Sequence, residues 1–596
     1  MREIKEAPVT PLEADENLTD VIVANAAQAP DLPVLSRPAA GGGWEDVTAA
    51  EFLADVTATA KGLVASGVEP GDRIGLLCKT RYEWTLFDFA IWFTGAVTVP
   101  IYETSSAEQV KWILSDSGAA GLIVETTEHA QTAGSLKAEL ADVKNVWVID
   151  DGAVGQLHEA GAGVADDEIE RRRRTLKVDS VATVIYTSGT TGRPKGCELT
   201  HANFLGLARG ASAIFGELVT EGKSTLLFLP LAHVFARFIQ VLCLVTRARL
   251  SHSPSVAQLL DDLQATKPTF LLAVPRVFEK IYNSAEAKAR GEGKGRIFGI
   301  AADTAIEYSR ALDDGGPGLL LRVRHAVFDR LVYSKLRAAT GGAVEGAVSG
   351  GAPLGQRLGH FFRGIGIDIL EGWGLTETTA PATVNTQARN KIGTVGRPLP
   401  GVSIRIGDDG ELLVGGVGVL KGYWNNEQAT AEAITDGWFH TGDLGEIDDD
   451  GYVSITGRKK EILVTAGGKN VSPAQLEDRM RAHPLISQAM VVGDGKPFIA
   501  CLITLDAEML PGWLKNHGKG DMSVEEAAKD DDVRAELQKA VDDANTTVSK
   551  AESIRKFTVL SDDWTEASGH LTPKMSIKRA VVMKDYAEDV EALYAK

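Results

Sequence analysis

The stretch Tyr186-Thr187-Ser188-Gly189-Thr190-Thr191-Gly192-Arg193-Pro194-Lys195-Gly196 decides how the rest of this 596-residue sequence is interpreted. It directly follows the apolar run 181–185. Its three glycines let backbone N–H groups turn toward an anion without hindrance from Cβ atoms, while the hydroxyls add donors and the lysine adds a positive charge. We therefore interpret it as a polyphosphate-binding loop between two strands.

The loop differs from a Walker A motif, in which Gly-Lys-Ser/Thr opens a helix, because Pro194 precedes the lysine and favours extended backbone. A polar surface loop is the alternative for such a composition. The whole run, however, resembles the nucleotide-binding signature of the acyl-adenylate-forming superfamily. The resemblance implies that the following residues bind the nucleotide: Thr187, Ser188, Gly189, Thr190, Thr191 and Lys195.

Composition limits the classes of protein that fit. A hydrophobic fraction of 44% and a charged fraction of 24% are typical of a soluble globular protein. The net charge of −19 argues against nonspecific binding to nucleic acid or to an anionic membrane. The one basic run, Arg171 to Arg174, is interpreted as a solvated connector. Four scattered cysteines indicate neither a disulfide framework nor a zinc site, so a cytoplasmic protein is expected.

No targeting or membrane-spanning segment is expected. Residues 1–16 are acidic, lack a signal-peptide core and are interpreted as a loose start. The longest apolar stretch, 89–102, is interrupted by Thr94, Gly95 and Pro100 and is shorter than the ~20 residues that a spanning helix needs. Peripheral membrane contact and a homodimer both stay open.

Strand and helix patterns alternate through the first part of the chain. Capping boxes at Thr48 and Ser106 predict helix starts, the first helix ending at Gly67. A further helix is predicted over 82–93, with strands over 74–77, 96–99, 121–124, 226–229 and 269–274, and a helix behind Ser255. This alternation is typical of a parallel sheet covered on both faces.

The fold class predicted is therefore α/β, with a large N-terminal domain of doubly wound sheets over 1–457. Short strands and tight turns over about 393–455 predict a β-rich subdomain. Residues 458–596 are expected to form a small mobile α+β domain, with a hairpin over 489–505 and a strand over 557–560.

Two glycine-rich turns carry further chemistry. Glu377 has the hard carboxylate oxygen that Mg²⁺ prefers, and Thr376 can donate to an α-phosphate. A lone Thr-Glu pair would be a helix cap, but Gly372-Trp373-Gly374-Leu375-Thr376-Glu377 resembles a superfamily element with these roles. Gly351, Ala352 and Pro353, with Gly372 and Trp373, resemble its adenine-binding wall.

Asp443 carries an acceptor-only carboxylate suited to two ribose hydroxyls. Alone it would pass for a turn residue, but Thr-Gly-Asp-Leu-Gly resembles the superfamily's ribose-binding motif, and Arg458 corresponds to its arginine on the same sugar. His233 on an apolar run has two interpretations, a satisfied core residue or a substrate-site residue. Its segment, with Phe235, resembles the one that lines the acyl and pantetheine channels.

The C-terminal motifs imply motion and contain one departure from the pattern. Lys460 stands at the superfamily's hinge position, and Gly468 is implied to enter the site for thioester formation. The adenylation lysine is expected at position 576, where this chain has Ser576. If the segment is extended, residues 574, 576 and 578 share one face, so Lys574, or else Lys578, is the candidate replacement. The alternative is that both lysines only face solvent.

Within the superfamily, 274–280 and 571–579 look most like long-chain fatty acid–CoA ligases. That resemblance implies ATP-dependent activation of a fatty acid to an acyl-adenylate, with Mg²⁺ as cofactor and coenzyme A as the acceptor. The alternatives are transfer of the acyl group to a carrier protein and a nucleotide-binding homologue without turnover.

Overall fold

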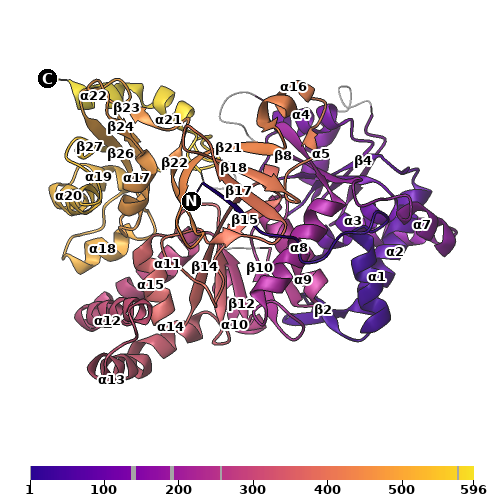
Figure 1. Cartoon of the computed structure of the whole chain (residues 1–596), viewed down its shortest axis with the longest axis horizontal. Coiled ribbons are helices and arrows are strands. Elements are labelled where there is room, and N and C mark those ends of the chain that lie inside the picture. The colour runs from indigo at the N-terminus through magenta and orange to yellow at the C-terminus, as the bar shows by residue number, and fades with distance from the viewer. Residues whose placement is uncertain (1, 136–141, 188–192, 255–257, 573–575, 596) are drawn as a thin grey trace.

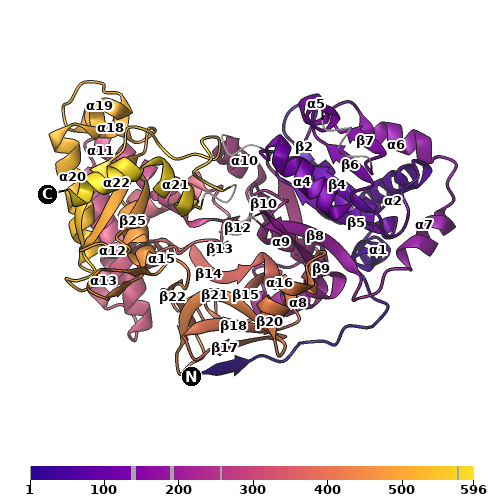
Figure 2. The ribbon, with the colours of Figure 1, turned by 90° about the horizontal axis from the view of Figure 1, so that it is seen from above.

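The computed structural model describes residues 2–595 except 136–141, 188–192, 255–257 and 573–575. Two large sheets and a smaller third one make up most of the chain, and a unit with its own three-stranded sheet follows (Figure 1). Figure 2 shows the first large sheet and the C-terminal unit at opposite ends of the molecule, with the other sheets between them. The α/β prediction is confirmed.

The first sheet contains the strands on both sides of the predicted polyphosphate loop. Its strands run in the order β19-β9-β8-β5-β4-β6-β7, parallel from β8 to β7, with β9 antiparallel to β8. The predicted strand over 96–99 begins one residue later and is longer, whereas 121–124 is confirmed. In sheet order the strands span Gly422–Tyr423, Lys195–Thr200, Val181–Thr187, Val97–Ile101, Arg73–Leu77, Gly121–Val124 and Asn145–Val148.

Nine α-helices, α1 to α9, lie among the described residues between Thr19 and Thr246. Both capping boxes are confirmed, since the Thr48 and Ser106 side chains accept the Glu51 and Gln109 N–H groups. The helices span Thr19–Gln28, Ala49–Ala65, Tyr82–Phe93, Ala107–Ser117, Thr127–Ser135, Ala153–Gly161, Asp166–Arg173, His201–Phe215 and Val234–Thr246.

The interpretation of Arg171 to Arg174 as a solvated connector is wrong for its middle residues. Arg172 and Arg173 end α7 and are buried, only 5% and 3% exposed. Arg173 pairs with Asp20 of α1 at 2.7 Å, and Arg172 donates to the carbonyl oxygen of Val68 at 2.6 Å. Contacts with partners about 100 residues or more away in sequence decide this burial, and a local charge pattern does not reveal them.

The second sheet is the larger one, in the order β16-β15-β14-β13-β12-β10-β11-β2-β3, parallel from β14 to β2. The predicted strand over 226–229 lies two residues earlier, because the Leu229 carbonyl leaves the sheet to accept the Thr80 hydroxyl at 2.7 Å. In sheet order the strands span Arg397–Pro398, Ala380–Val384, Asp368–Leu375, Gly346–Ser349, Phe270–Ala273, Ser224–Leu227, Arg249–His252, Pro33–Pro38 and Trp44–Thr48.

A buried ion pair lies between helices α3 and α9, in the core that joins both large sheets. The side chains of Asp88 and Arg237 are fully buried and make two hydrogen bonds to each other. Arg237 also donates to the Thr183 hydroxyl of β8 at 2.5 Å and packs over the rings of Trp84 and Trp92. This network ties β8, which leads into the phosphate loop, to the helix that carries Phe235.

The third sheet contains the expected β-rich subdomain, in the order β1-β17-β18-β21-β20, with β22 paired to β21. Its first strand corrects the expectation of a loose start. Glu3–Lys5 forms β1 and pairs antiparallel with β17, and Glu3 binds Arg405 at 2.7 Å. In sheet order the strands span Glu3–Lys5, Val402–Ile406, Glu411–Gly416, Trp438–Ile447 and Ile434–Thr435, with β22 over Val453–Arg458.

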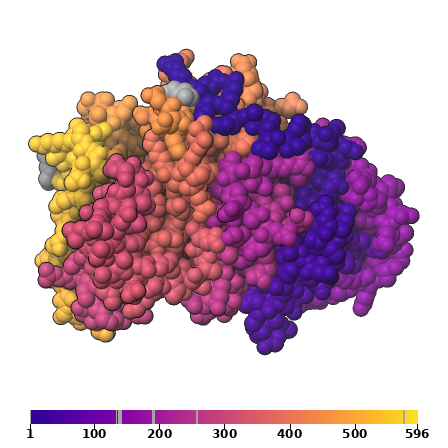
Figure 3. Space-filling model, turned by 60° about the horizontal axis from the view of Figure 1, so that its bottom comes forward, coloured from indigo at the N-terminus to yellow at the C-terminus, as the bar shows by residue number. Residues whose placement is uncertain are grey.

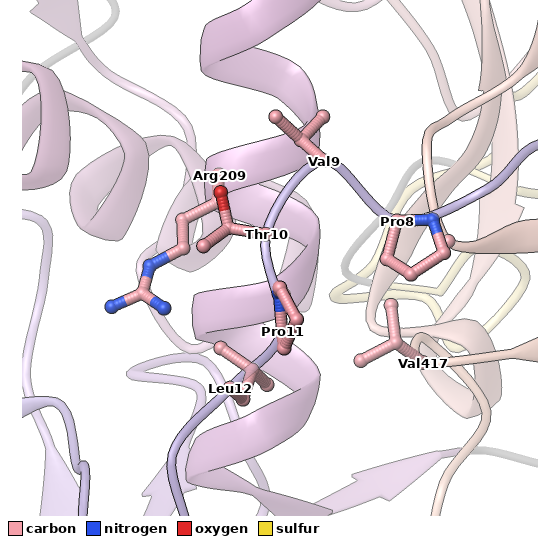
Figure 4. A pocket seen from close by; sticks show the side chains of 9 residues that line it. Pro8, Val9, Thr10, Pro11, Leu12, Arg209 and Val417 are labelled. Carbon is pink, nitrogen blue, oxygen red and sulfur yellow. The ribbon is translucent and has the colours of Figure 1, made fainter.

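From β1 the chain crosses the surface toward α1, and the indigo segment in Figure 3 follows this path. Pro8 to Leu12 lie along α8 and, with Arg209, Gly401 and Val417, line a cavity of about 280 Å³ (Figure 4). The N-terminal residues therefore bridge two parts of the large domain.

A helical layer covers one side of the second sheet, and Phe278, Phe298 and Phe361 belong to its core. The strand predicted over 269–274 is confirmed as β12, one residue shorter at each end, and Pro275 then begins α11. The predicted cap at Ser255 lies outside the described residues, and α10 begins at Leu259. Helices α10 to α16, with the π-helical turn η2 after α13, span Leu259–Thr266, Pro275–Gly291, Gly295–Asp313, Leu319–Phe328, Asp329–Tyr333 (η2), Ser334–Ala339, Gln356–Gly364 and Glu427–Ala433.

The C-terminal unit contains the predicted antiparallel pair, β25 with β26, and β27 beside β26 in parallel. Arg276 and Lys280 of α11 form ion pairs with Asp506 and Glu508 of this unit at 2.7 and 2.6 Å. Strands β23 to β27 span Leu463–Val464, Asn470–Val471, Ile486–Val492, Ile499–Leu505 and Ile554–Val559. Helices α17 to α22 span Pro473–Arg481, Leu510–Asn516, Val524–Ala528, Asp531–Asn545, Arg579–Asp585 and Ala587–Tyr594.

Candidate functional site

The polyphosphate loop leaves β8 and returns in β9. Thr187 and Lys195 are partners in the antiparallel register, so they hold the two ends of the loop together. Lys195 is exposed to solvent. The predicted phosphate-binding residues Ser188, Gly189, Thr190 and Thr191 lie outside the described residues.

Lys195 and Glu377 both contact Tyr423. The Tyr423 hydroxyl donates to the Glu377 carboxylate at 3.1 Å, and the Lys195 ammonium lies 5.0 Å from the centre of the Tyr423 ring. Burial, followed by the charge of Glu377, raises the pKa of Tyr423 far above its ordinary value, so the phenol stays a donor. Sequence reasoning missed Tyr423, because no local pattern indicates that its short strand pairs with β9.

The turn after β14 places Thr376 and Glu377. Thr376 is buried. Shortly after it, Thr379 and Ala380 have positive φ angles of 58° and 76°. The chain doubles back so tightly that a Cβ atom at Gly374 would lie 1.7 Å from the Ala380 carbonyl oxygen. Glycine is therefore required at position 374 for this turn to form.

Asp443 is the best-held of the predicted nucleotide-binding residues. It is 4% exposed, and each of its carboxylate oxygens accepts one hydrogen bond, from Trp373 Nε1 at 2.7 Å and from Arg458 Nε at 3.0 Å. Asp443 and Arg458 are also partners in the β21–β22 register. Since a carboxylate oxygen can accept two bonds, one acceptor position on each oxygen is left for a ligand hydroxyl.

A buried glutamate supports the turn that precedes Asp443. Glu411 accepts the Gly442 N–H at 2.8 Å and lies 3.4 Å from the Lys459 ammonium. Nothing in the local sequence distinguishes Glu411 from the neighbouring acidic residues, so this role was not predicted.

The predicted adenine wall and Phe235 lie against each other. A Cβ atom at Gly350 would be 3.2 Å from the Phe235 ring and 3.5 Å from the Gly372 carbonyl oxygen, so these three residues touch. Gly351, Ala352 and Pro353 are exposed, and the next residue, Leu354, donates its N–H to Glu371 at 2.9 Å. Burial raises the pKa of Glu371 to about 7.

His233 caps the helix that carries Phe235. Its ring Nδ1 accepts the Phe235 N–H at 3.1 Å, and the residue is half-buried. Its place beside Phe235 keeps it near the predicted substrate site. His201, by contrast, is fully buried at the start of α8, where burial, with a smaller contribution from the Arg237 charge, lowers its pKa to about 3.

The predicted hinge and thioester residues lie on exposed turns. Lys460 follows β22, beside a cavity of about 250 Å³ that Met490, Arg579 and Met583 also line. Gly468, with φ +75°, lies in the turn between β23 and β24. Among the described residues, no hydrogen bond or ion pair joins either of them to the end of β14 or to Asp443.

The extended segment on which the assignment of Lys574 depends includes residues 573–575, which lie outside the described residues. On either side of these residues, Leu571 and Ile577 pair antiparallel, and the Thr572 N–H donates to the Ser576 carbonyl oxygen at 2.9 Å. Lys574 lies outside the described residues, and Lys578 is half-buried immediately before α21.

The segment 371–377 at the end of β14 links these contacts. Gly372 touches Phe235's neighbour Gly350, and Trp373 binds Asp443. Glu377 binds Tyr423, whose ring also contacts the Lys195 ammonium. Motifs far apart in sequence thus meet at the carboxyl end of a parallel strand, which is where α/β sheets usually bind ligands. Polar donors, a lysine and a carboxylate in this arrangement suit a nucleotide with its phosphates.

Comparison with known proteins gives a consistent result. Residues 22–424 match the model of the AMP-binding enzyme family, and 460–596 match that of the AMP-binding enzyme C-terminal domain. The chain is 53% identical to the long-chain-fatty-acid–CoA ligase FadD15 of Mycobacterium bovis over the full length of both, and 29% identical to human long-chain-fatty-acid–CoA ligase ACSBG2, over 92% of this chain and 88% of that protein.

Solved structures share the fold. The A domain of carboxylic acid reductase from Segniliparus rugosus, in complex with AMP and a co-purified carboxylic acid, superposes with a TM-score of 0.73 at 22% identity. The match covers 97% of this chain and 94% of that one.

Proposed function

Because this chain belongs to the AMP-binding enzyme family, we propose that it is a long-chain fatty acid–CoA ligase. In the first half-reaction a carboxylate oxygen of the fatty acid attacks the α-phosphorus of ATP, and pyrophosphate leaves. In the second, the thiol of coenzyme A attacks the acyl carbon of the adenylate, the thiol proton is lost, and AMP leaves. The observation that carries the proposal is the meeting of Lys195, Glu377 and Asp443 around the end of β14.

The described residues have separate tasks in adenylation. Asp443 would accept the two ribose hydroxyls while Arg458 and Trp373 hold its carboxylate in place. Thr376 would donate to the α-phosphate, and Lys195 would face the phosphates from the returning end of the loop. Positioning and charge stabilisation of this kind provide most of the rate enhancement in phosphorus transfer.

A magnesium ion fits Glu377. Mg²⁺ usually takes one or two protein carboxylates and completes its shell with phosphate oxygens and water. Glu377 offers such a carboxylate, and the Tyr423 hydroxyl fixes its orientation, as groups bonded to a metal ligand commonly do. When bound, the ion would neutralise charge on the phosphate oxygens.

The C-terminal unit supplies the parts expected to change between half-reactions. We assign the adenylation lysine to Lys574, with Lys578 as the nearest alternative, the hinge to Lys460 and the thioester-site contact to Gly468. We place the domain boundary at 457/458, beside the hinge. We also infer that the enzyme works in the cytoplasm, where its four buried cysteines stay as thiols and form no disulfide. No described helix is both long and apolar enough to cross a bilayer.

Two assays on the purified chain test the proposal. Palmitate-dependent exchange of labelled pyrophosphate into ATP reports adenylation, and thioester formation from coenzyme A reports the second step. Absence of exchange with every chain length would refute adenylation. Exchange without a thioester would instead indicate transfer to a carrier protein.

A further inference from the structure

Helix α13 presents an apolar stripe to solvent. Leu319 and Leu320 are 81% and 84% exposed, and Val323, Val327 and Leu331 are each at least half exposed. The spacing of four residues from 319 through 323 and 327 to 331 keeps these side chains near one face of the helix. Single exposed apolar residues are ordinary, but contiguous patches of this kind indicate an interaction surface.

The inner face of the same helix is firmly attached, so the exposure does not come from a detached segment. Tyr333, fully buried in the π-helical turn, donates its hydroxyl to the Ala301 carbonyl oxygen at 2.6 Å. His325 stacks on Tyr308 at 3.8 Å and lies 2.6 Å from the Gly364 carbonyl oxygen. Leu319 and Leu320 are therefore exposed on an anchored helix. Figure 1 shows this helix, α13, at the edge of the molecule.

The charge of this segment is opposite to that of the chain. Residues 319–337 contain five basic side chains and one acidic one, a net charge of +4, whereas the whole chain carries −19. Arg324 and Arg337 pair with acidic residues. In the part of the chain that the structure describes, Arg322, Arg330 and Lys335 have no carboxylate within 4 Å.

We propose that α13 and the π-helical turn after it dock on an anionic phospholipid surface. The exposed leucines and valines would enter the boundary between headgroups and acyl chains, and the arginines and the lysine would bind lipid phosphates. Helices that lie in the interface combine such an apolar face with basic flanks. A second copy of the chain fits less well, because pairing of like surfaces would bring two basic clusters together.

Docking would place the enzyme at the phase into which its proposed long-chain substrate partitions. The surface itself is independent of catalysis, since no residue of α13 contacts the segment 371–377 or Asp443 through a described hydrogen bond or ion pair. Vesicle binding and adenylation can therefore fail separately.

Co-sedimentation of the full chain with vesicles tests the proposal. We expect binding to phosphatidylcholine–phosphatidylglycerol (1:1) vesicles, weaker binding to phosphatidylcholine alone, and loss of binding at high salt. The triple variant Leu319→Ser, Leu320→Ser, Val323→Ser should lower partitioning at least tenfold. Arg322→Gln, Arg330→Gln, Lys335→Gln should lower it about a hundredfold, since each basic residue near such a surface contributes roughly fivefold.

Matched variants serve as controls. Val9→Ser, Val146→Ser, Leu260→Ser removes exposed apolar side chains elsewhere, and Lys515→Gln, Lys550→Gln, Lys556→Gln removes exposed charges. Both should bind vesicles as the parent chain does, and all variants should keep their circular dichroism and their turnover of a short, soluble acid. The proposal is overturned if the parent chain shows no preference for phosphatidylglycerol, or if patch and control variants behave alike. It is also overturned if light scattering shows a dimer that the Leu319 variant converts to a monomer.

Discussion

The end of β14 and the C-terminal motifs differ in how their functional residues are held. Asp443 is buried, with a donor on each carboxylate oxygen, and Glu377 is fixed by Tyr423. Lys460 and Gly468, by contrast, lie on exposed turns. From this difference we infer that the proposed nucleotide site is formed before ligand binds, whereas the groups proposed for the acyl steps depend on the position of the C-terminal unit.

The contacts between the two parts agree with this view. The pairs Arg276–Asp506 and Lys280–Glu508 are partly or largely exposed, and exposed ion pairs contribute only about 0–1 kcal/mol each. Movement of the C-terminal unit would therefore cost little at these points. The predictions below test whether the two parts separate functionally in this way.

The largest effect is expected from Asp443→Ala. The change removes the ribose acceptor and leaves the Trp373 N–H without its carboxylate, so kcat/KM for ATP in pyrophosphate exchange should fall roughly a thousandfold. Asp449→Ala, in the exposed turn that follows β21, is the control and should be neutral. A loss below tenfold would contradict the idea that the nucleotide site depends on this residue.

Lys574→Ala should slow adenylation by about a hundredfold, as loss of one oriented charge-stabilising group typically does. Thioester formation from supplied acyl-adenylate should stay nearly unchanged, and both rates can be measured by quenched single turnover. If Lys578→Ala shows the defect instead, the assignment is wrong by four residues. If neither variant is slowed, no lysine of this segment takes the role.

Tyr423→Phe removes the hydroxyl that orients Glu377. We expect the Mg²⁺ concentration for half-maximal pyrophosphate exchange to rise about tenfold, because partners of metal ligands commonly affect affinity by that amount. Tyr452→Phe, whose hydroxyl makes only a 3.4 Å contact with a backbone carbonyl, provides the comparison. An unchanged Mg²⁺ dependence would remove Glu377 as the metal ligand or Tyr423 as its support.

Lys460→Pro should restrict the backbone of the hinge. Thioester formation should fall about fivefold while adenylation changes less, because only the second half-reaction then lacks its domain position. Lys460→Ala removes the charge but keeps the backbone freedom and should affect both steps little. Equal loss of both half-reactions in the proline variant would count against a hinge at this position.

The smallest effect is a pH dependence of folding stability at Glu371. Burial raises its pKa from 4.5 to about 7, with a smaller contribution from the charge of Asp478 in the C-terminal unit. The folded state binds this proton more tightly than the unfolded chain. The stabilisation is therefore complete below about pH 4.5 and is lost as pH rises through about 7.

The pKa shift of Glu371 alone corresponds to about 3 kcal/mol of folding stability. Because Glu371 keeps some contact with water, we expect the free energy of unfolding to fall by only about 1–2 kcal/mol between pH 5 and 8. Urea unfolding of Glu371→Gln should lack this part of the pH dependence. A slope that is unchanged in the variant would show that another group causes it.

Local patterns in the sequence predicted much of this molecule. The capping boxes at Thr48 and Ser106, the strands around the phosphate loop and the hairpin after residue 485 depend on residues within a few positions of each other, so they can be seen without a fold. The family resemblance of short motifs likewise named Trp373, Asp443 and Arg458, which the structure brings together.

Tertiary structure alone decided the contacts between distant segments. The pairing of Glu3–Lys5 with β17, the burial of Arg172 and Arg173, and the Tyr423–Glu377 hydrogen bond join residues that are tens to hundreds of positions apart. Tertiary structure likewise decides the exposure of Leu319 and Leu320. A leucine-rich helix is expected to be buried, and only the packing shows which of its faces is covered. Sequence periodicity reports which side chains share a face, but only the assembled chain determines what that face meets.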